Sequence, residues 1–443
     1  MFRFLIHPIR PRVLAVLLPA MCFAATAPAI ASRPAAPAHA RVCSATQYGA
    51  KPDGATLDTR AIQAAIDACA AKGGGIVRLA GGTFLSGPIV LKSHITLDIE
   101  TGATLLGSPD HADYPVVLVF GAKGHQSLIS ASHAQDLTIA GGGTIDGNGA
   151  SWWAEARKEK DHGVVEDVVF RPRLIVFDHC RRILIDHVLI ENSPSWQVVP
   201  YYSDDVTVRD GKIYAPAHSP NTDGIDPFSS SHVTIEHMTI DDGDDNVAIK
   251  SGLPNTTGNA PSTDITVTDC TFLHGHGMSI GSEVAGGVQD VHVSHIVFKG
   301  TDNGIRVKSA RDRGADISDL WYSDLKMEDV KTPLLITEYY PHIPEHDAAR
   351  PVTRLTPHFH DIHITNLTAT GAKMTGIIAG LPESPIRNLC LDNVHLQGEY
   401  GLRISNATVT ERGLTVLPAT PPPVILLDNA RLIRNQASAS FTQ

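Results

Sequence analysis

Short β-branched runs recur along most of this 443-residue chain. Each run starts with a polar residue and continues with alternating Val, Ile and Thr, as in residues 205–208 (Asp-Val-Thr-Val) and 232–235 (His-Val-Thr-Ile). The first apolar residues of these runs are Ile183, Val206, Val233, Ile265, Val291, Ile317, Ile362 and Ile386. Most steps between them are 23 to 32 residues long. A period of this size is typical of a solenoid in which each turn buries its apolar face on the next, so the repeat predicts a parallel β-helix.

The alternative for many short strands is a sandwich of two antiparallel sheets. The repeat interval is long for hairpins, and Asn-Gly turn signals are sparse, so the β-helix is favoured. One step, from Ile317 to Ile362, is 45 residues long and predicts a missed turn or an insertion around residues 339–356. Residues 60–71 carry one apolar stripe at helical spacing after the capping candidates Asp58 and Thr59. We therefore expect an all-β, single-domain solenoid whose amino-terminal end is covered by a capping helix.

The amino terminus has the pattern of an export signal. A basic start is followed by a mostly apolar run at residues 13–27 and by small residues at 29–31. The run is short and interrupted by proline, which argues against a membrane span. We expect a signal peptide over residues 1–31, a flexible leader over 32–43 and the β-helix domain over 44–435. This predicts a secreted protein that is not held in a membrane.

Charge and cysteine content exclude several classes of function. The formal charge is −11, so the chain has no long-range attraction for nucleic acid, and an acidic ligand would need locally placed cations. No CxxC pair is present, which argues against a structural zinc site. Cys43 and Cys69 flank the expected helix and are candidates for a disulfide, although sequence alone leaves this open. Cys180 and Cys270 lie in strand-like runs, where they are expected as small buried apolar groups.

Two groups of acids stand about one short repeat apart. Asp223 lies in an Asn-Thr-Asp-Gly turn, and Asp244 and Asp245 follow Gly243. Taken singly, Asp223 reads as a turn cap, and the acidic run 241–245 as a solvated turn or a calcium site. If coils stack in register and the chain bends at Gly243, the three acids converge. Crowded carboxylates raise at least one pKa, and a protonated acid beside ionised bases is what glycoside cleavage uses.

The next two repeats add an imidazole and two cations. His276 stands between two glycines, where an exposed polar role is the ordinary reading. Arg306 and Lys308 are two positions apart in a strand-like run, so their side chains share one face. They could simply protect a strand edge, or they could hold a carboxylate of an acidic sugar. Because all these groups recur near the repeat period, we expect one site for an acidic polysaccharide.

The motifs, in this order, resemble glycoside hydrolase family 28, the polygalacturonases. They are Asn-Thr-Asp-Gly at 221–224, Gly-Asp-Asp at 243–245, Gly-His-Gly at 275–277 and Arg-x-Lys at 306–308. The resemblance covers about residues 44–430 and includes the accessory stretches 143–147 (Gly-Thr-Ile-Asp-Gly) and 192–196 (Asn-Ser-Pro-Ser-Trp). It implies a right-handed parallel β-helix that hydrolyses α-1,4 bonds between galacturonates with inversion, using no cofactor and no metal.

The resemblance also implies roles for individual residues. Asp244 matches the general acid, Asp223 and Asp245 match the pair that activates water, and His276 matches the residue that supports protonation of the acid.

Four further residues are implied to contact the substrate. Arg306 and Lys308 match the residues that bind its carboxylate, and Asn221 belongs to the first motif. The family places a tyrosine further along the chain, for which Tyr340 is the better candidate and Tyr339 its neighbour.

One position departs from many fungal members, since Asn246 stands where they have Cys; this resembles the bacterial and plant-like branch. The Arg-x-Lys pair favours a galacturonate backbone over those cut by xylogalacturonan and rhamnogalacturonan hydrolases, which stay open as related activities. Two different classes also stay open: a calcium-dependent pectate lyase and a non-catalytic solenoid that binds acidic glycans. We expect a monomer, and endo rather than exo action.

Overall fold

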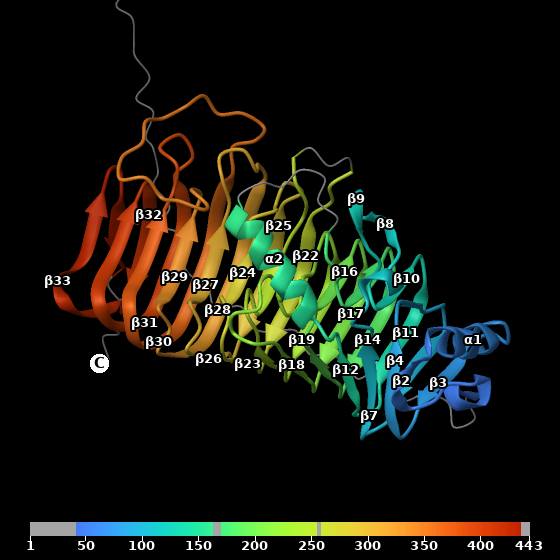
Figure 1. The fold of residues 1–443 in the computed structure, drawn as a ribbon. Coiled ribbons are helices and arrows are strands. Elements are labelled where there is room, and N and C mark those ends of the chain that lie inside the picture. The colour runs from blue at the N-terminus through green and yellow to red at the C-terminus, as the bar shows by residue number, and fades with distance from the viewer. Residues whose placement is uncertain (1–40, 163–169, 255–257, 436–443) are drawn as a thin grey trace, which may run out of the picture. The chain divides into compact units, whose positions relative to one another are not determined.

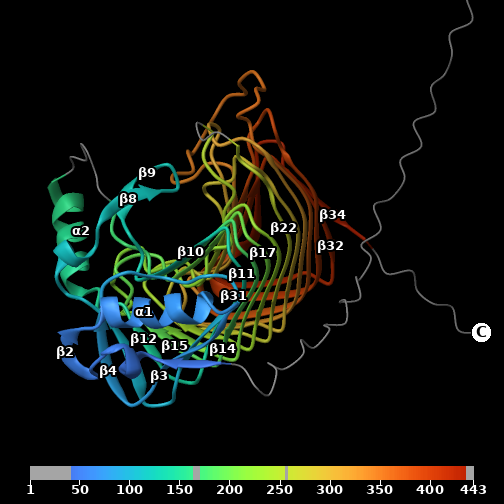
Figure 2. The ribbon, with the colours of Figure 1, turned by 90° about the vertical axis from the view of Figure 1, so that its right-hand side faces the viewer.

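The computed structural model describes residues 41–162, 170–254 and 258–435. The predicted signal peptide, 1–31, and residues 32–40 of the leader lie outside these residues. Parallel strands stack coil upon coil along residues 41–435 and form the right-handed parallel β-helix that the sequence predicted (Figure 1). Each coil contributes strands to three faces, and viewed along the stack the faces surround a common interior (Figure 2).

The strands divide among the faces by their pairing. The first face contains β1 (Val42–Ser44), β3 (Gly75–Leu79), β6 (Ile95–Ile99), β11 (Gln135–Ala140), β14 (Arg181–Asp186), β17 (Asp204–Arg209), β19 (Ser231–Glu236), β22 (Ser262–Thr268), β25 (Val288–Ser294), β32 (Ala407–Arg412) and β34 (Arg431–Arg434). The second face contains β2 (Asp53–Leu57), β4 (Gly82–Ser86), β7 (Ala103–Gly107), β12 (Thr144–Asp146), β15 (Leu189–Glu191), β18 (Lys212–Tyr214), β20 (Thr239–Asp241), β23 (Thr271–Phe272) and β26 (Val297–Lys299).

The third face carries most of the candidate site. It contains β5 (Ile89–Val90), β10 (Ile129–Ser132), β13 (Ile175–Asp178), β16 (Val198–Tyr201), β21 (Val247–Ile249), β24 (Met278–Ile280), β27 (Asn303–Lys308) and β29 (Thr332–Thr337). In the last coils, long strands turn the corners between faces: β28 (Asp316–Glu328), β30 (His358–Ala379), β31 (Ile386–Ser405) and β33 (Thr415–Leu427).

A few elements lie outside the three faces. They are η1 (Ala45–Tyr48), α1 (Thr59–Ala70), η2 (His111–Asp113), the antiparallel hairpin of β8 (Val116–Val119) and β9 (Ala122–His125), and α2 (Ala150–His162). The described residues contain no helix that is long and apolar enough to cross a membrane.

The core is built from inward-facing apolar residues of successive strands, stacked in rows from coil to coil. On the first face the stacked residues are Leu137, Ile183, Val206, Val233, Ile265, Val291, Leu320, Ile362, Leu389 and Val409. Each is at most 1% exposed. Full burial of a Val, Leu or Ile side chain contributes about 1.5–3 kcal/mol, so each such row is a main source of stability.

In two coils the core residue expected from the sequence is not the one that occupies the row. Ile317 and Ile386 were expected in this row, but Leu320 and Leu389 occupy it. The reason is the polar residue that opens each run. It has a left-handed backbone at the corner, as at Asp205 (φ 56°), and this conformation favours Asp, Asn and His among non-glycine residues. In the two misplaced coils the left-handed residues are Asp319 and Asn388, which directly precede the true row members.

The predicted capping helix is α1, which lies across the amino-terminal end of the stack (Figures 1 and 2). Its apolar stripe is fully buried, and Cys69 at the end of that stripe forms a disulfide with Cys43. The expected side-chain cap is absent, because Asp58 accepts from the backbone N–H of Lys51 instead. Cys180 and Cys270 are buried, as predicted.

The 45-residue step contains an insertion and no additional coil. β28 pairs directly with β30, so the two are neighbours in the stack. The added residues form the irregular segment between β29 and β30, which includes the expected stretch 339–356.

Candidate active site

Consecutive coils of the third face bring the sequence motifs together. The paired positions are, coil by coil, Ile225, Val247, Met278 and Ile305. Asp223, Asp245 and His276 each lie two positions before the paired residue of their coil, and Arg306 lies one position after its own. The register therefore lines up the acids and the imidazole along one row, with the cations beside it.

Asp245 is held by three donors. Arg306 Nη1 and Ser279 Oγ each lie 2.6 Å from its Oδ1, and Lys308 Nζ lies 2.6 Å from its Oδ2. The side chain of Asp245 is only 2% exposed. Burial alone would raise the pKa of Asp245, but the charges of Lys308 and Arg306 outweigh it and hold the pKa well below its usual range. Asp245 is thus an ionised carboxylate, and Ser279 is a partner that the sequence motifs did not single out.

Asp244 faces the imidazole. His276 Nδ1 lies 3.0 Å from Asp244 Oδ1 and 3.9 Å from Asp245 Oδ1. Asn221 Nδ2 lies 3.5 Å from Asp244 Oδ2, and Asn221 Oδ1 accepts from Arg171 Nη2 at 2.8 Å. Burial opposes protonation of His276, but its hydrogen bond to Asp244 and the neighbouring negative charges outweigh burial and raise its pKa. The imidazole is therefore favoured in its cationic form beside the acid.

The acidic run 241–245 is not a solvated turn. Asp242 is fully buried, and Asp241 points elsewhere, with His274 Nδ1 at 2.7 Å from its Oδ1. The chain bends at Gly243 and Asp244, as predicted, although the φ of Gly243 is not left-handed. The function of Gly243 is close approach, because a Cβ there would overlap the carbonyl oxygen of Ser219 in the preceding coil.

A buried ammonium that the sequence motifs did not single out lies under the acids. Lys250 Nζ is 3.5 Å from Glu283 Oε2, 3.6 Å from Asp223 Oδ2 and 3.9 Å from Asp226 Oδ1. Lys250 is 5% exposed, and Asp226 is fully buried. The signal was present, because strand alternation from the inward Val247 places Lys250 on the outer face, beside the acids.

Burial raises the pKa values of Asp223 and Asp226. Burial raises the pKa of Asp223 well above its usual value, and the charges of Asp226 and Asp244 raise it further, while Lys250 acts in the opposite direction. Burial likewise raises the pKa of Asp226 to about 8. With a pKa of about 8, Asp226 holds a proton at neutral pH.

The two candidate tyrosines lie beside different cations. The ring centroid of Tyr340 lies 5.4 Å from Lys308 Nζ and 5.9 Å from Arg306 Cζ. Tyr339 instead packs against Arg311, at 5.7 Å. Of the two candidates, Tyr340 is therefore the one beside the site cations.

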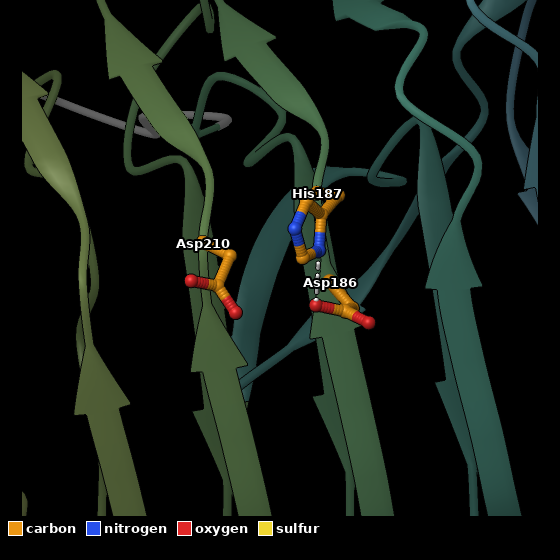
Figure 3. Close-up of side chains that lie close together, drawn as sticks. All are labelled: Asp186, His187 and Asp210. Carbon is orange, nitrogen blue, oxygen red and sulfur yellow. Dashed lines mark hydrogen bonds and ion pairs between the residues drawn. The ribbon is translucent and has the colours of Figure 1, made fainter. Parts of the chain in front are cut away.

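Among the described residues, two groups of side chains have ligand atoms close enough to share a metal ion: Asp244, Asp245 and His276, and Asp186, His187 and Asp210. In the first group, Asp245 already binds Arg306 and Lys308. The second lies at the carboxyl ends of the neighbouring strands β14 and β17 (Figure 3). There His187 Nδ1 is 2.6 Å from Asp186 Oδ1, and Arg209 Nε is 3.2 Å from the same oxygen and 3.7 Å from Asp210 Oδ2. Since a cation already faces both carboxylates of the second group, we assign it no metal.

The site thus combines an ionised carboxylate, further buried or half-buried acids and a cationic imidazole. Two more cations stand within 3 Å of the central carboxylate. Such a set can donate a proton to a leaving oxygen, accept one from water and hold an anionic substrate.

Comparison with known proteins indicates the same kind of chemistry. The chain is 32% identical over 373 residues to a probable polygalacturonase of Vitis vinifera, covering 80% of this chain and 74% of that protein. It is 32% identical over 376 residues to an endo-polygalacturonase of Pectobacterium carotovorum subsp. carotovorum, covering 81% and 89%.

A solved structure supports the fold as well. The exopolygalacturonase of Thermotoga maritima superposes with a TM-score of 0.68 at 27% identity, covering 89% of this chain and 92% of that one. The family model for glycosyl hydrolases family 28 matches residues 75–413. This chain therefore belongs to glycosyl hydrolases family 28.

Proposed function

We propose that this protein is a polygalacturonase that hydrolyses α-1,4 bonds between galacturonates with inversion. The observation that carries the proposal is the convergence around Asp245. A buried, ionised carboxylate, a protonatable acid with its imidazole and two cations lie on adjacent coils of one face. Its relatives are named for this activity, and the bacterial relative above is named for the endo form.

In the proposed mechanism, Asp244 donates its proton to the glycosidic oxygen as the bond to the anomeric carbon breaks. Asp245, with Asp223, takes a proton from the water that attacks the opposite side of that carbon. His276, as a cation, stabilises the carboxylate that forms on Asp244 after proton transfer. The sugar is inverted, and the proton balance returns when Asp244 and the bases re-equilibrate with water.

Substrate binding is proposed for Arg306, Lys308, Tyr340 and Asn221. Arg306 Nε is buried and without a hydrogen-bond partner, so it has a donor left for a uronate carboxylate although Nη1 is engaged with Asp245. Lys308 has two further N–H donors, since one contact accounts for one of its three.

The central experiment measures release of reducing ends from polygalacturonate, with and without a chelator. We expect activity that does not require divalent metal, and its near-complete loss in Asp244→Asn. The matched control is Asp241→Asn, in the same acidic run but directed at His274, which should retain activity. Unsaturated products that absorb in the near ultraviolet and vanish on chelation would instead indicate a lyase. Full activity in Asp244→Asn would refute the assignment.

We also propose that the protein is secreted, monomeric and endo-acting. The signal-like residues 1–31 and the Cys43–Cys69 disulfide fit an oxidising compartment outside the cytosol. Determination of the mature amino terminus should find Ser32 first. A time course of product lengths should show intermediate oligomers early, whereas monomer alone from the start would indicate exo action.

A further inference from the structure

Arg173 lies in the same row as the acids but has no place in the proposed mechanism. Ile175 pairs with Val198, which bridges to Ile225, and Arg173 stands two positions before Ile175. The row is therefore, coil by coil, Arg173, Trp196, Asp223, Asp245 and His276. With coils about 4.8 Å apart, the backbone of Arg173 is about 10 Å from that of Asp223, on the side away from Arg306.

The guanidinium of Arg173 is enclosed by aromatic rings. Its Cζ lies 4.6 Å from the ring centroids of both Phe120 and Trp196, and 5.8 Å from that of Phe170. Lys250 Nζ also lies over the ring of Trp196, 4.6 Å from its centroid. Trp196 ends the accessory stretch 192–196, so the enclosure explains a motif that the proposed mechanism leaves without a role.

Phe120 reaches this position at a conformational cost. It occupies the two-residue turn between β8 and β9, where its φ is 54° and that of the following Gly121 is 81°. Two successive positive φ values are typical of a tight hairpin turn, which normally has Asn, Asp or Gly at the first position. A bulky side chain there is uncommon, and such strain is often retained at ligand sites. Here the strained residue covers Arg173.

The guanidinium lacks hydrogen-bond acceptors. Arg173 is 9% exposed, and its Nε and Nη1 are buried without any hydrogen-bond partner. The nearby carboxylates Asp223, Asp226 and Glu283 are engaged with Lys250 instead, and no carboxylate of the described residues lies within ion-pair distance of Arg173. Burial lowers the pKa of Arg173 to about 10, so it is still a cation at neutral pH.

Burying a cation whose N–H donors have no acceptors costs free energy, and contacts with aromatic rings offset only part of it. A planar guanidinium with free donors matches a carboxylate in two-point geometry. A polymer lying along the row would present one carboxylate per sugar, with Arg306 and Lys308 beyond the acids on one side and Arg173 on the other.

We propose that Arg173, framed by Phe120 and Trp196, binds the carboxylate of a second uronate of the substrate, on the side of the scissile bond opposite Arg306. This rests on the proposed function. It makes the stretch from β13 to β27 one extended binding face for a polyanion.

The test measures binding in the Asp244→Asn background, so that the substrate is not consumed. Calorimetric titration with a galacturonate hexamer should give a dissociation constant about tenfold to a hundredfold weaker for Arg173→Met, the range expected for loss of a charge-assisted hydrogen bond. With the fully methyl-esterified hexamer, Arg173→Met and its parent should bind equally. The matched control is Arg181→Met, an exposed arginine on the first face, which should bind like the parent.

Arg173→Lys keeps the test decisive if Arg173→Met does not fold. It retains the charge but loses the planar fork, and we expect several-fold weaker binding of the acidic hexamer. Equal binding by Arg173→Lys and the parent, or by Arg173→Met and the parent, would overturn the proposal and reduce Arg173 to a packing role. If the unsubstituted protein neither binds nor hydrolyses oligogalacturonates, it is the proposed function itself that fails.

Discussion

Replacing Asp245 by Asn should separate the stability of the site from its chemistry. The change keeps the shape of the side chain and removes one charge that faces Arg306 and Lys308 at 2.6 Å each. At an effective dielectric constant of about 20, each contact corresponds to about 6 kcal/mol of gross attraction. Much of this is offset, because an amide costs less to dehydrate than a carboxylate. Breaking a buried pair by removing one partner usually leaves a net loss of about 3–5 kcal/mol, and we expect that loss in the free energy of unfolding.

Asp244→Asn is the matched comparison. Asp244 and its partner His276 have side chains that are 22% and 30% exposed, so solvent can replace part of their interaction. We expect a loss of about 1 kcal/mol, the usual value for one hydrogen bond. Urea unfolding followed by circular dichroism gives both stabilities, and reducing-end release from polygalacturonate gives both activities. Both variants should be nearly inactive, but only Asp245→Asn should be strongly destabilised. Equal stabilities would refute the charge balance described for Asp245.

Three further outcomes are expected. Lys250→Met removes the cation that favours the ionised form of Asp223, so the pKa of Asp223 should rise further. The acidic limb of the pH–activity profile should then move to higher pH. An acidic limb at the same pH in Lys250→Met and the parent would contradict this. The pKa of His276 is raised above its usual value. Activity that needs the His276 cation should therefore persist to higher pH than for an ordinary histidine, and it should fall as pH rises through the raised pKa. The residual activity of His276→Asn should not show this fall. Replacing both Cys43 and Cys69 by Ala removes a cross-link across 26 residues, which is worth about 3.5 kcal/mol in the loop-entropy model; thermal scans should show an earlier transition confined to the amino-terminal coils, and a single unshifted transition would argue against it.

The fold was predictable because each coil requires particular residue types at particular positions, and these recur in the sequence. Each coil needs a left-handed corner, which Asp, Asn and His tolerate, followed by an inward Val, Ile or Leu. Both signals are visible in the sequence, but in two coils the run was started three residues too early, at Asp316 instead of Asp319 and at Pro385 instead of Asn388. Periodicity alone could not decide between them, because both precede apolar residues; the corner conformation that decides is a property of the folded chain.

The site was predictable where acids, imidazole and cations recur near the repeat period, and less so where charged residues are buried in pairs. Asp244 and His276 stand out in the sequence and meet in the structure. Lys250 and Asp226 were missed, since their roles follow from burial next to another charge, which depends on three coils at once. Arg173 was missed for a related reason: its importance lies in acceptors that its surroundings do not provide, and no sequence pattern signals that.

The spacing of the motifs shows how such a site stays intact while coil lengths vary. Asp223 and Asp245 are 22 residues apart, whereas Asp245 and His276 are 31 apart, yet both pairs occupy adjacent places in one row. In the sequence, the extra residues of the longer coil fall between β21, which ends at Ile249, and β22, which begins at Ser262. An insertion of one residue within a strand of the third face would instead turn every following side chain of that strand to the opposite face. Length can therefore change at the corners without moving the acids, and alignment between coils, more than spacing along the chain, sets the geometry of the site.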